Sequence, residues 1–126
     1  MDVNERIARA LGWEPCPGAA GICAPLYGKP MCRFNALLDP REKRHASVPD
    51  YAHSLDACLH VRAALREKGW RFVLTDKLDG ESWCCHGGRT KGFFAGMEQG
   101  EADVCNAPSL AAALAECLAD ALEALP

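Results

Sequence analysis

The chain has 126 residues, of which 49% are hydrophobic and 25% are charged, and its formal net charge is −3. These values are typical of one globular domain with one core, and they exclude a globally disordered chain and a strongly basic one. All 14 basic residues precede residue 92, together with 11 of the 17 acidic ones, so residues 92–126 carry only acids. We therefore expect the C-terminal element not to approach phosphate.

The cysteines and the lengths of the apolar runs indicate in which cellular compartment the protein is located. No apolar run is long enough to span a bilayer, and the first residues, MDVNERIARALGW, contain acids where a secretory signal has an apolar core. We expect a cytoplasmic protein in a reducing compartment, so its eight cysteines are predicted to be mostly free thiols. Cys58 and Cys117 lie beside leucines on helical faces, which predicts that both are buried as small apolar residues.

The N-terminal third predicts one short helix followed by irregular chain. The helix is predicted over residues 3–11, because Ile7 and Leu11 are four residues apart and Gly12 follows. Prolines and glycines are scattered through residues 14–49, and they prevent long helices and central strands there. Only Met31 to Leu38 is predicted as a short edge strand. This irregular insert needs either mobility or a tether to stay in a compact domain.

Residues 54–76 predict a helix–strand unit around which the rest of the chain is organised. Apolar residues recur at spacings of three and four: Leu55, Cys58, Leu59, Val61 and Leu65. This spacing predicts a helix over 54–68, with Ser54 as its N-cap and Gly69 as its left-handed end. From Trp70 the period changes to two, which predicts a strand over 70–76. A tight joint would place Trp70 and Phe72 over Leu59 and Leu65.

The C-terminal half predicts a meander of strands and a last helix. Strands are expected over 82–86 and 90–95, with a short one over 102–105, and the turns between them at Asp79-Gly80 and Gly87-Gly88. A helix is predicted over 108–124, with one apolar stripe: Leu110, Leu114, Cys117, Leu118, Ala121, Leu122 and Leu125. The order predicts an α+β fold over a single domain, 1–126, in which an antiparallel sheet of three or four strands is packed between helices.

Three stretches together resemble a known family. They are ERIARALGW at 5–13, PDYAHSLDACLHVRAALREKGWRFVL at 49–74 and APSLAAALAECLADALEAL at 107–125, roughly half the chain. They are similar to the phage ABA-sandwich domain family, small phage and prophage proteins of unknown function. The resemblance implies a sheet packed between helices, a phage or prophage origin, and therefore the cytoplasm of a bacterial host. It implies no catalytic motif and no site residue.

The cysteines of the insert suggest a metal site. Cys16, Cys23 and Cys32 are separated by six and eight residues, and His45 is a possible fourth ligand. Zinc prefers four thiolate or imidazole ligands, and a bound ion would explain how a proline-rich insert stays ordered. The spacings are wider than those of a zinc knuckle, so three free thiols on a loop are the alternative.

A second cluster, Cys84-Cys85-His86, falls on a predicted strand. Alternation places Cys84 and His86 on one face and Cys85 on the other. A thiol nucleophile also needs a base within hydrogen-bonding reach and an orienting group, which two same-face positions do not supply by themselves. We therefore interpret the cluster as part of a half-buried strand and predict no catalytic residue.

The sequence favours a non-enzymatic binding module with an unknown protein partner from phage or host. Neither membrane nor nucleic acid is expected as a partner, and the sequence is compatible with an oligomer. One alternative is the same module stabilised by zinc. Another is a double-stranded-RNA-binding domain, which has the same order of helix, three strands and helix. Such a domain needs a basic start to its final helix, and Ala107-Pro108-Ser109 offers no base.

Overall fold

The structure is a computed structural model that describes residues 2–16, 37–41, 45–77, 80–89 and 102–125. Contacts within the chain group it into two compact units. The first unit contains Met1–Ile7 and Pro49–Pro126, and the second contains Ala8–Val48. Among the described residues, no helix has the length and apolar character needed to cross a membrane.

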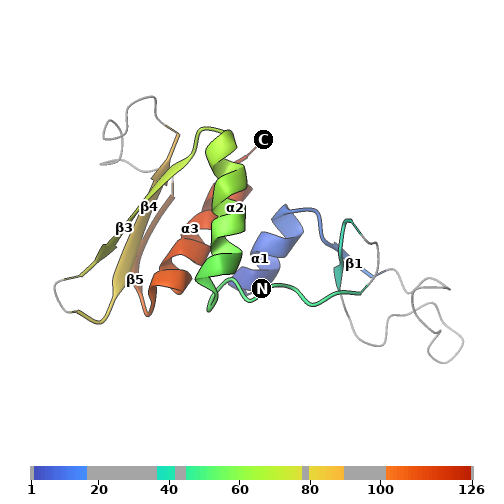
Figure 1. The fold of residues 1–126 in the computed structure, drawn as a ribbon, viewed down its shortest axis with the longest axis horizontal. Coiled ribbons are helices and arrows are strands. Elements are labelled where there is room, and N and C mark those ends of the chain that lie inside the picture. Colours follow the sequence, from blue (N-terminus) through green and yellow to red (C-terminus); the bar gives the residue numbers. More distant parts are fainter. Residues whose placement is uncertain (1, 17–36, 42–44, 78–79, 90–101, 126) are drawn as a thin grey trace, which may run out of the picture. The chain divides into compact units, whose positions relative to one another are not determined.

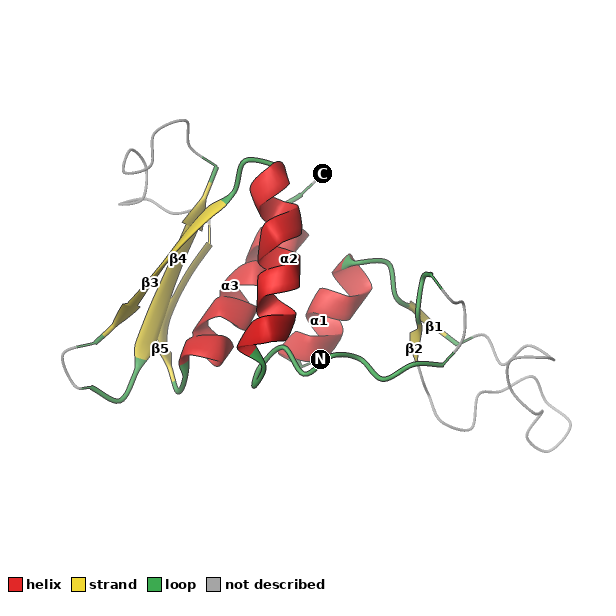
Figure 2. Cartoon of the chain, in the orientation of Figure 1, coloured by secondary structure: helices red, strands yellow, loops and turns green. Residues whose placement is uncertain are grey.

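The first unit contains a three-stranded antiparallel sheet. Its strands are β3 (Arg71–Asp76), β4 (Trp83–Gly88) and β5 (Ala102–Ala107), in the order β3-β4-β5 (Figure 2). The strands predicted at 70–76, 82–86 and 102–105 are confirmed, whereas the one predicted at 90–95 lies outside the described residues. The turn predicted at Gly87-Gly88 is wrong, because both glycines are paired residues of β4.

The helices begin and end where their capping residues predict. They are α1 (Val3–Ala10), α2 (Leu55–Glu67) and α3 (Leu110–Glu123), against predictions of 3–11, 54–68 and 108–124. The Ser54 hydroxyl accepts a hydrogen bond from the amide of Ala57 at 3.2 Å. At the other end of α2, Gly69 has φ +93° and the amide of Trp70 reaches back to the Leu65 carbonyl at 3.1 Å.

Helix α3 lies at the centre of the first unit. It packs against the sheet, chiefly β4 and β5, and also against α2 (Figure 1). Its buried residues therefore occupy several faces: Ala111, Ala113, Leu114, Ala115, Cys117, Leu118, Ala119 and Ala121. Alanine suits this position, because it favours helix and lets neighbouring backbones approach closely. The single apolar stripe predicted for this helix was too narrow.

The unit of residues 54–76 is less central than predicted. Helix α2 packs mainly on α3, burying Cys58, Val61 and Leu65. Leu59 keeps 40% of its surface exposed, so the predicted cover of Leu59 by Trp70 and Phe72 is wrong. Trp70 is fully buried and stacks on Phe72 instead, with 5.9 Å between ring centroids.

The predicted α+β fold, with an antiparallel sheet packed against helices, is confirmed. In the described part of the first unit, α2 and α3 lie on the same side of the sheet (Figure 1). The layers are therefore sheet, α3 and α2, so a helix rather than the sheet occupies the middle. No described helix covers the other face of the sheet, which we call the open face.

In its described residues, the second unit has short extended pieces beyond the end of α1. Strands β1 (Glu14–Pro15) and β2 (Leu37–Leu38) pair antiparallel, and Leu38 also bridges to His45. Of the edge strand predicted at Met31 to Leu38, only these last two residues are described. Gly12, with a φ of +100°, separates α1 from β1. Most of the insert predicted at 14–49 falls in this unit, and much of it lies outside the described residues.

Candidate functional site on the open face of the sheet

The pleat of β4 decides which side chains reach the open face. A Cβ on Gly87 would lie 3.4 Å from the Cys117 sulfur of α3, and Cys85 hydrogen-bonds to the same sulfur. Gly87 and Cys85 therefore face the helices. Because successive side chains of a strand alternate, Cys84 and His86 face the open side. The same-face placement predicted for Cys84 and His86 is confirmed.

His86 is paired with an acid from the neighbouring strand. Asp103 is its register partner on β5, and its Oδ1 lies 2.6 Å from Nδ1 of His86. An ionised carboxylate only accepts hydrogen bonds, so Nδ1 carries the hydrogen and Nε2 is left for other partners. Both side chains are partly exposed, at 35% and 46%. The pair therefore fixes the orientation of an imidazole at the surface of the sheet.

Next to this pair, two thiols oppose each other across the same strands. The register shifts after Cys85↔Val104, so Cys84 lies opposite both Cys105 and Asn106, before the next pair Trp83↔Ala107. The two thiols are hydrogen-bonded, and this contact raises the pKa of Cys105. Cys105 is exposed, whereas only 6% of Cys84 is exposed. The open face thus holds a small array of two thiols beside an imidazole–carboxylate pair.

The two thiols of the array lie at a β-bulge. Trp83 pairs with Ala107, so β5 has one more residue than β4 between this pair and the next. The extra length is taken up near Asn106, which has φ +64°. Asn106 accepts a hydrogen bond from the ammonium group of Lys77 at the end of β3. Bulges increase local twist and re-aim side chains, and this one lies directly beside Cys105.

A second pair of thiols lies on the opposite face of the sheet. Cys85 and Cys117 are both fully buried between β4 and α3. Their hydrogen bond, together with burial, raises the pKa of Cys117. The Cys117 sulfur also donates to the Ala102 carbonyl at 3.3 Å. All six described cysteines are free thiols, as predicted, and Cys58 and Cys117 are buried as predicted.

Among the described residues, the array lacks the thiol–imidazole contact of a catalytic pair and the three grouped ligands of a metal site. In the described chain, His86 bonds only to Asp103, and no hydrogen bond joins it to either thiol. The described residues also contain no group of three or more side chains placed to hold a metal ion. Sequence reasoning found Cys84 and His86 but missed their partners on β5. The signal was present, because Asp103 and Cys105 repeat the two-residue spacing of His86 and Cys84.

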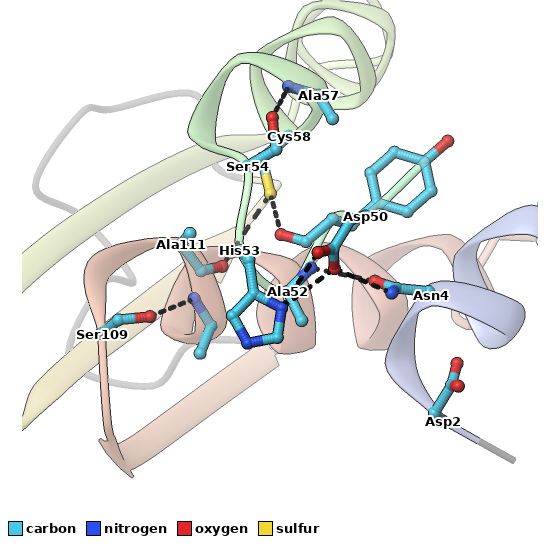
Figure 3. Close-up of polar contacts among 12 residues, drawn as sticks. Asp2, Asn4, Asp50, Ala52, His53, Ser54, Ala57, Cys58, Ser109 and Ala111 are labelled. Atoms are coloured by element: carbon cyan, nitrogen blue, oxygen red, sulfur yellow. Dashed lines mark hydrogen bonds and ion pairs between the residues drawn. The ribbon is translucent and has the colours of Figure 1, made fainter. Parts of the chain in front are cut away.

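A polar cluster at the start of α2 has a structural role instead (Figure 3). Asn4 of α1 donates to Asp50 at 3.0 Å and accepts from the Ala52 amide at 2.9 Å. His53 also contacts the Asp50 carboxylate, at 3.0 Å. The hydrogen bonds from His53 and Asn4 lower the pKa of Asp50. The cluster joins the starts of two helices, and its exposed histidine is an ordinary surface residue.

The zinc site predicted in the insert stays a prediction. Cys16 and His45 belong to the second unit, but Cys23 and Cys32 lie outside the described residues. Metal analysis of protein purified without chelator is the direct test. Less than about half a zinc ion per chain would reject a structural zinc, since such a site binds tightly at neutral pH.

Comparisons with family models, with curated proteins and with solved structures give no match for this chain.

Proposed function

We propose that the protein is a non-enzymatic interaction module that binds a protein partner through the open face of its β3-β4-β5 sheet. The observation that carries this proposal is the packing of α2 and α3 on one side of the sheet. The opposite face presents side chains from three strands, including Val73, His86 and Asp103. A mixture of paired charge and partly buried apolar groups is typical of a non-obligate protein interface.

The chemistry of this face favours binding over turnover. A general base must be within hydrogen-bonding reach of the group that it deprotonates. The His86 imidazole is directed to Asp103 rather than to the thiols in the described part of the chain. The phage or prophage origin belongs to the same proposal, and it is supported by the resemblance of residues 5–13, 49–74 and 107–125 to the phage family.

Affinity capture with matched surface variants tests the binding face. Tagged protein is incubated with lysate of the bacterial host, and retained proteins are compared between wild type, Val73→Arg and Arg66→Glu. Val73 lies on the open face, whereas Arg66 is exposed on α2. We expect a partner that Val73→Arg loses and Arg66→Glu retains. A partner that both variants retain, or no partner at all, contradicts the proposal.

Double-stranded RNA is a second candidate ligand. The order α2, β3, β4, β5, α3 is that of a double-stranded-RNA-binding domain. The acids of the C-terminal region oppose it, because residues 92–126 have no base to contact phosphate. A filter-binding assay at low salt is expected to retain no RNA. Salt-sensitive retention would favour this candidate over a protein partner.

A further inference from the structure

We infer that Cys84 and Cys105 form a reversible dithiol–disulfide site on the open face of the sheet, and that it exchanges with small-molecule disulfides. The first argument is the register. Cys84 lies between the pairs Trp83↔Ala107 and Cys85↔Val104, so it faces Cys105 and Asn106 at the β-bulge, and neighbouring strands lie about 4.7–4.9 Å apart. A disulfide requires about 4.4–6.8 Å between Cα atoms. The strands therefore hold the two residues at bridging distance before any oxidation.

The second argument is the unequal exposure of the two thiols. Cys105 is exposed and is the sulfur that a small molecule reaches, whereas Cys84 is buried against it. An accessible attacking thiol beside a protected resolving thiol is the arrangement that thiol–disulfide exchange needs. Cys84 also raises the pKa of the Cys105 thiol, in agreement with their placement across the β-bulge.

The exchange has two steps. The Cys105 thiolate attacks one sulfur of the small disulfide, whose S–S bond breaks, and the first small thiol leaves with the proton that Cys105 lost. The Cys84 thiolate then attacks the Cys105 sulfur of the mixed disulfide. The Cys84–Cys105 bond forms, and the second small thiol leaves with the proton of Cys84. Two protein thiols are oxidised, and one small disulfide is reduced to two thiols.

The buried pair Cys85–Cys117 is an internal control. Its thiols are also hydrogen-bonded, but both are fully buried between β4 and α3. Both pairs bring two thiols together, so it is solvent access that distinguishes the pair on the open face. We therefore expect Cys85 and Cys117 to react only after unfolding.

The test oxidises the full chain in glutathione buffers of increasing disulfide content, then quenches it with acid and blocks free thiols. Trypsin separates the segment after Lys77, with Cys84 and Cys85, from the segment after Lys91, with Cys105 and Cys117. We expect these two peptides to become cross-linked in wild type and to separate again after dithiothreitol. The cross-link should be lost in Cys84→Ser and in Cys105→Ser and kept in Cys85→Ser.

Fragmentation of the cross-linked peptides in the mass spectrometer locates the bond directly, so the result does not depend on the folding of Cys85→Ser. A bond between Cys84 and Cys105 supports the site. It is overturned by a bond between Cys85 and Cys117 in folded protein, by Cys105 that stays in a mixed disulfide, or by no cross-link in fully oxidised glutathione. None of these outcomes depends on a protein partner, so they leave the proposed interaction function to its own test.

Discussion

The ring of Phe72 lies over Gly87 across the β3–β4 pair, in the space that a side chain on residue 87 would occupy. A Cβ there would be 2.6 Å from Cε1 of the ring. Moving the ring away would disturb its stacking on the buried Trp70. We therefore expect Gly87→Ala to lower the free energy of unfolding by about 1–3 kcal/mol, as overpacked cores do. Urea denaturation followed by tryptophan fluorescence measures the change.

A double-mutant cycle separates this contact from any general cost of altering β4. The single variants Gly87→Ala and Phe72→Leu are compared with the double variant, in which the smaller leucine side chain leaves room for the added methyl. We expect the double variant to lose less free energy of unfolding than the two single losses added together, by more than about 0.5 kcal/mol. Strictly additive effects would show that the ring does not oppose the alanine.

Arg6 of α1 joins the end of α3 through two acids. Its guanidinium lies 2.7 Å from Asp120 and contacts both carboxylate oxygens of Glu123 at 2.9 Å. Acids in the last turn oppose the helix dipole, and α3 has no base of its own there. We expect Arg6→Gln to destabilise the protein by about 1 kcal/mol, less at high salt. In thermal unfolding, Arg6→Gln should lower the midpoint temperature, whereas the exposed control Arg66→Gln should leave it nearly unchanged.

Buried thiols predict a loss of stability at high pH. Burial, with a smaller contribution from Cys85, raises the pKa of Cys58 from 9.0 to about 11. A raised pKa contributes stability below the unfolded value, and this contribution is lost as pH rises toward the folded value. The free energy of unfolding should therefore fall between pH 9 and about 11, by on the order of 2 kcal/mol for Cys58.

The variant Cys58→Ala identifies the group responsible. It lacks the hydrogen bond that the Cys58 sulfur donates to the Tyr51 carbonyl at 3.0 Å, so it starts less stable at pH 7. Its stability should decline less steeply above pH 9 than that of wild type. Parallel curves would assign the alkaline transition to other groups, including Cys117, whose pKa is also raised.

We expect Asn4 to contribute more to stability than the exposed His53 beside it. Asn4→Ala removes the hydrogen bond to Asp50 and leaves the partly buried amide of Ala52 without its acceptor. We expect a loss of about 1–2 kcal/mol, because an unpaired buried amide is costly. His53 is 81% exposed, so His53→Ala should change stability by less than about 0.5 kcal/mol at neutral pH. Equal effects in chemical denaturation would contradict this division of roles.

The local order of the chain was predictable because capping residues and periodicity act over a few positions. Ser54 and Gly69 mark the ends of α2 as expected, and residues 71–76 form the strand that the period-two sequence pattern predicted. The central place of α3 was not predictable in this way. Its alanines are compatible with either burial or exposure, and only the packing of α2 and the sheet around them decides between the two.

Only part of the open-face array was predictable, for a related reason. Cys84 and His86 were found because they are close together in the sequence. Their partners Asp103 and Cys105 lie on β5, which is separated from β4 by a long stretch of sequence. Their pairing depends on register, and register is set jointly by both strands and by the bulge at Asn106. The Gly87-Gly88 turn was mispredicted for the same reason, because the Phe72 ring that fills the space beside Gly87 comes from the neighbouring strand.

The central position of α3 also constrains how the protein is made. The sheet and α2 are synthesised first, yet the surface on which both pack lies in residues 110–123. During translation the apolar faces of the strands and of α2 stay exposed to solvent until α3 has been synthesised, because both pack on α3. Contacts such as Arg6 with Glu123 span almost the whole chain, so folding is expected to be late and cooperative rather than stepwise from the N-terminus.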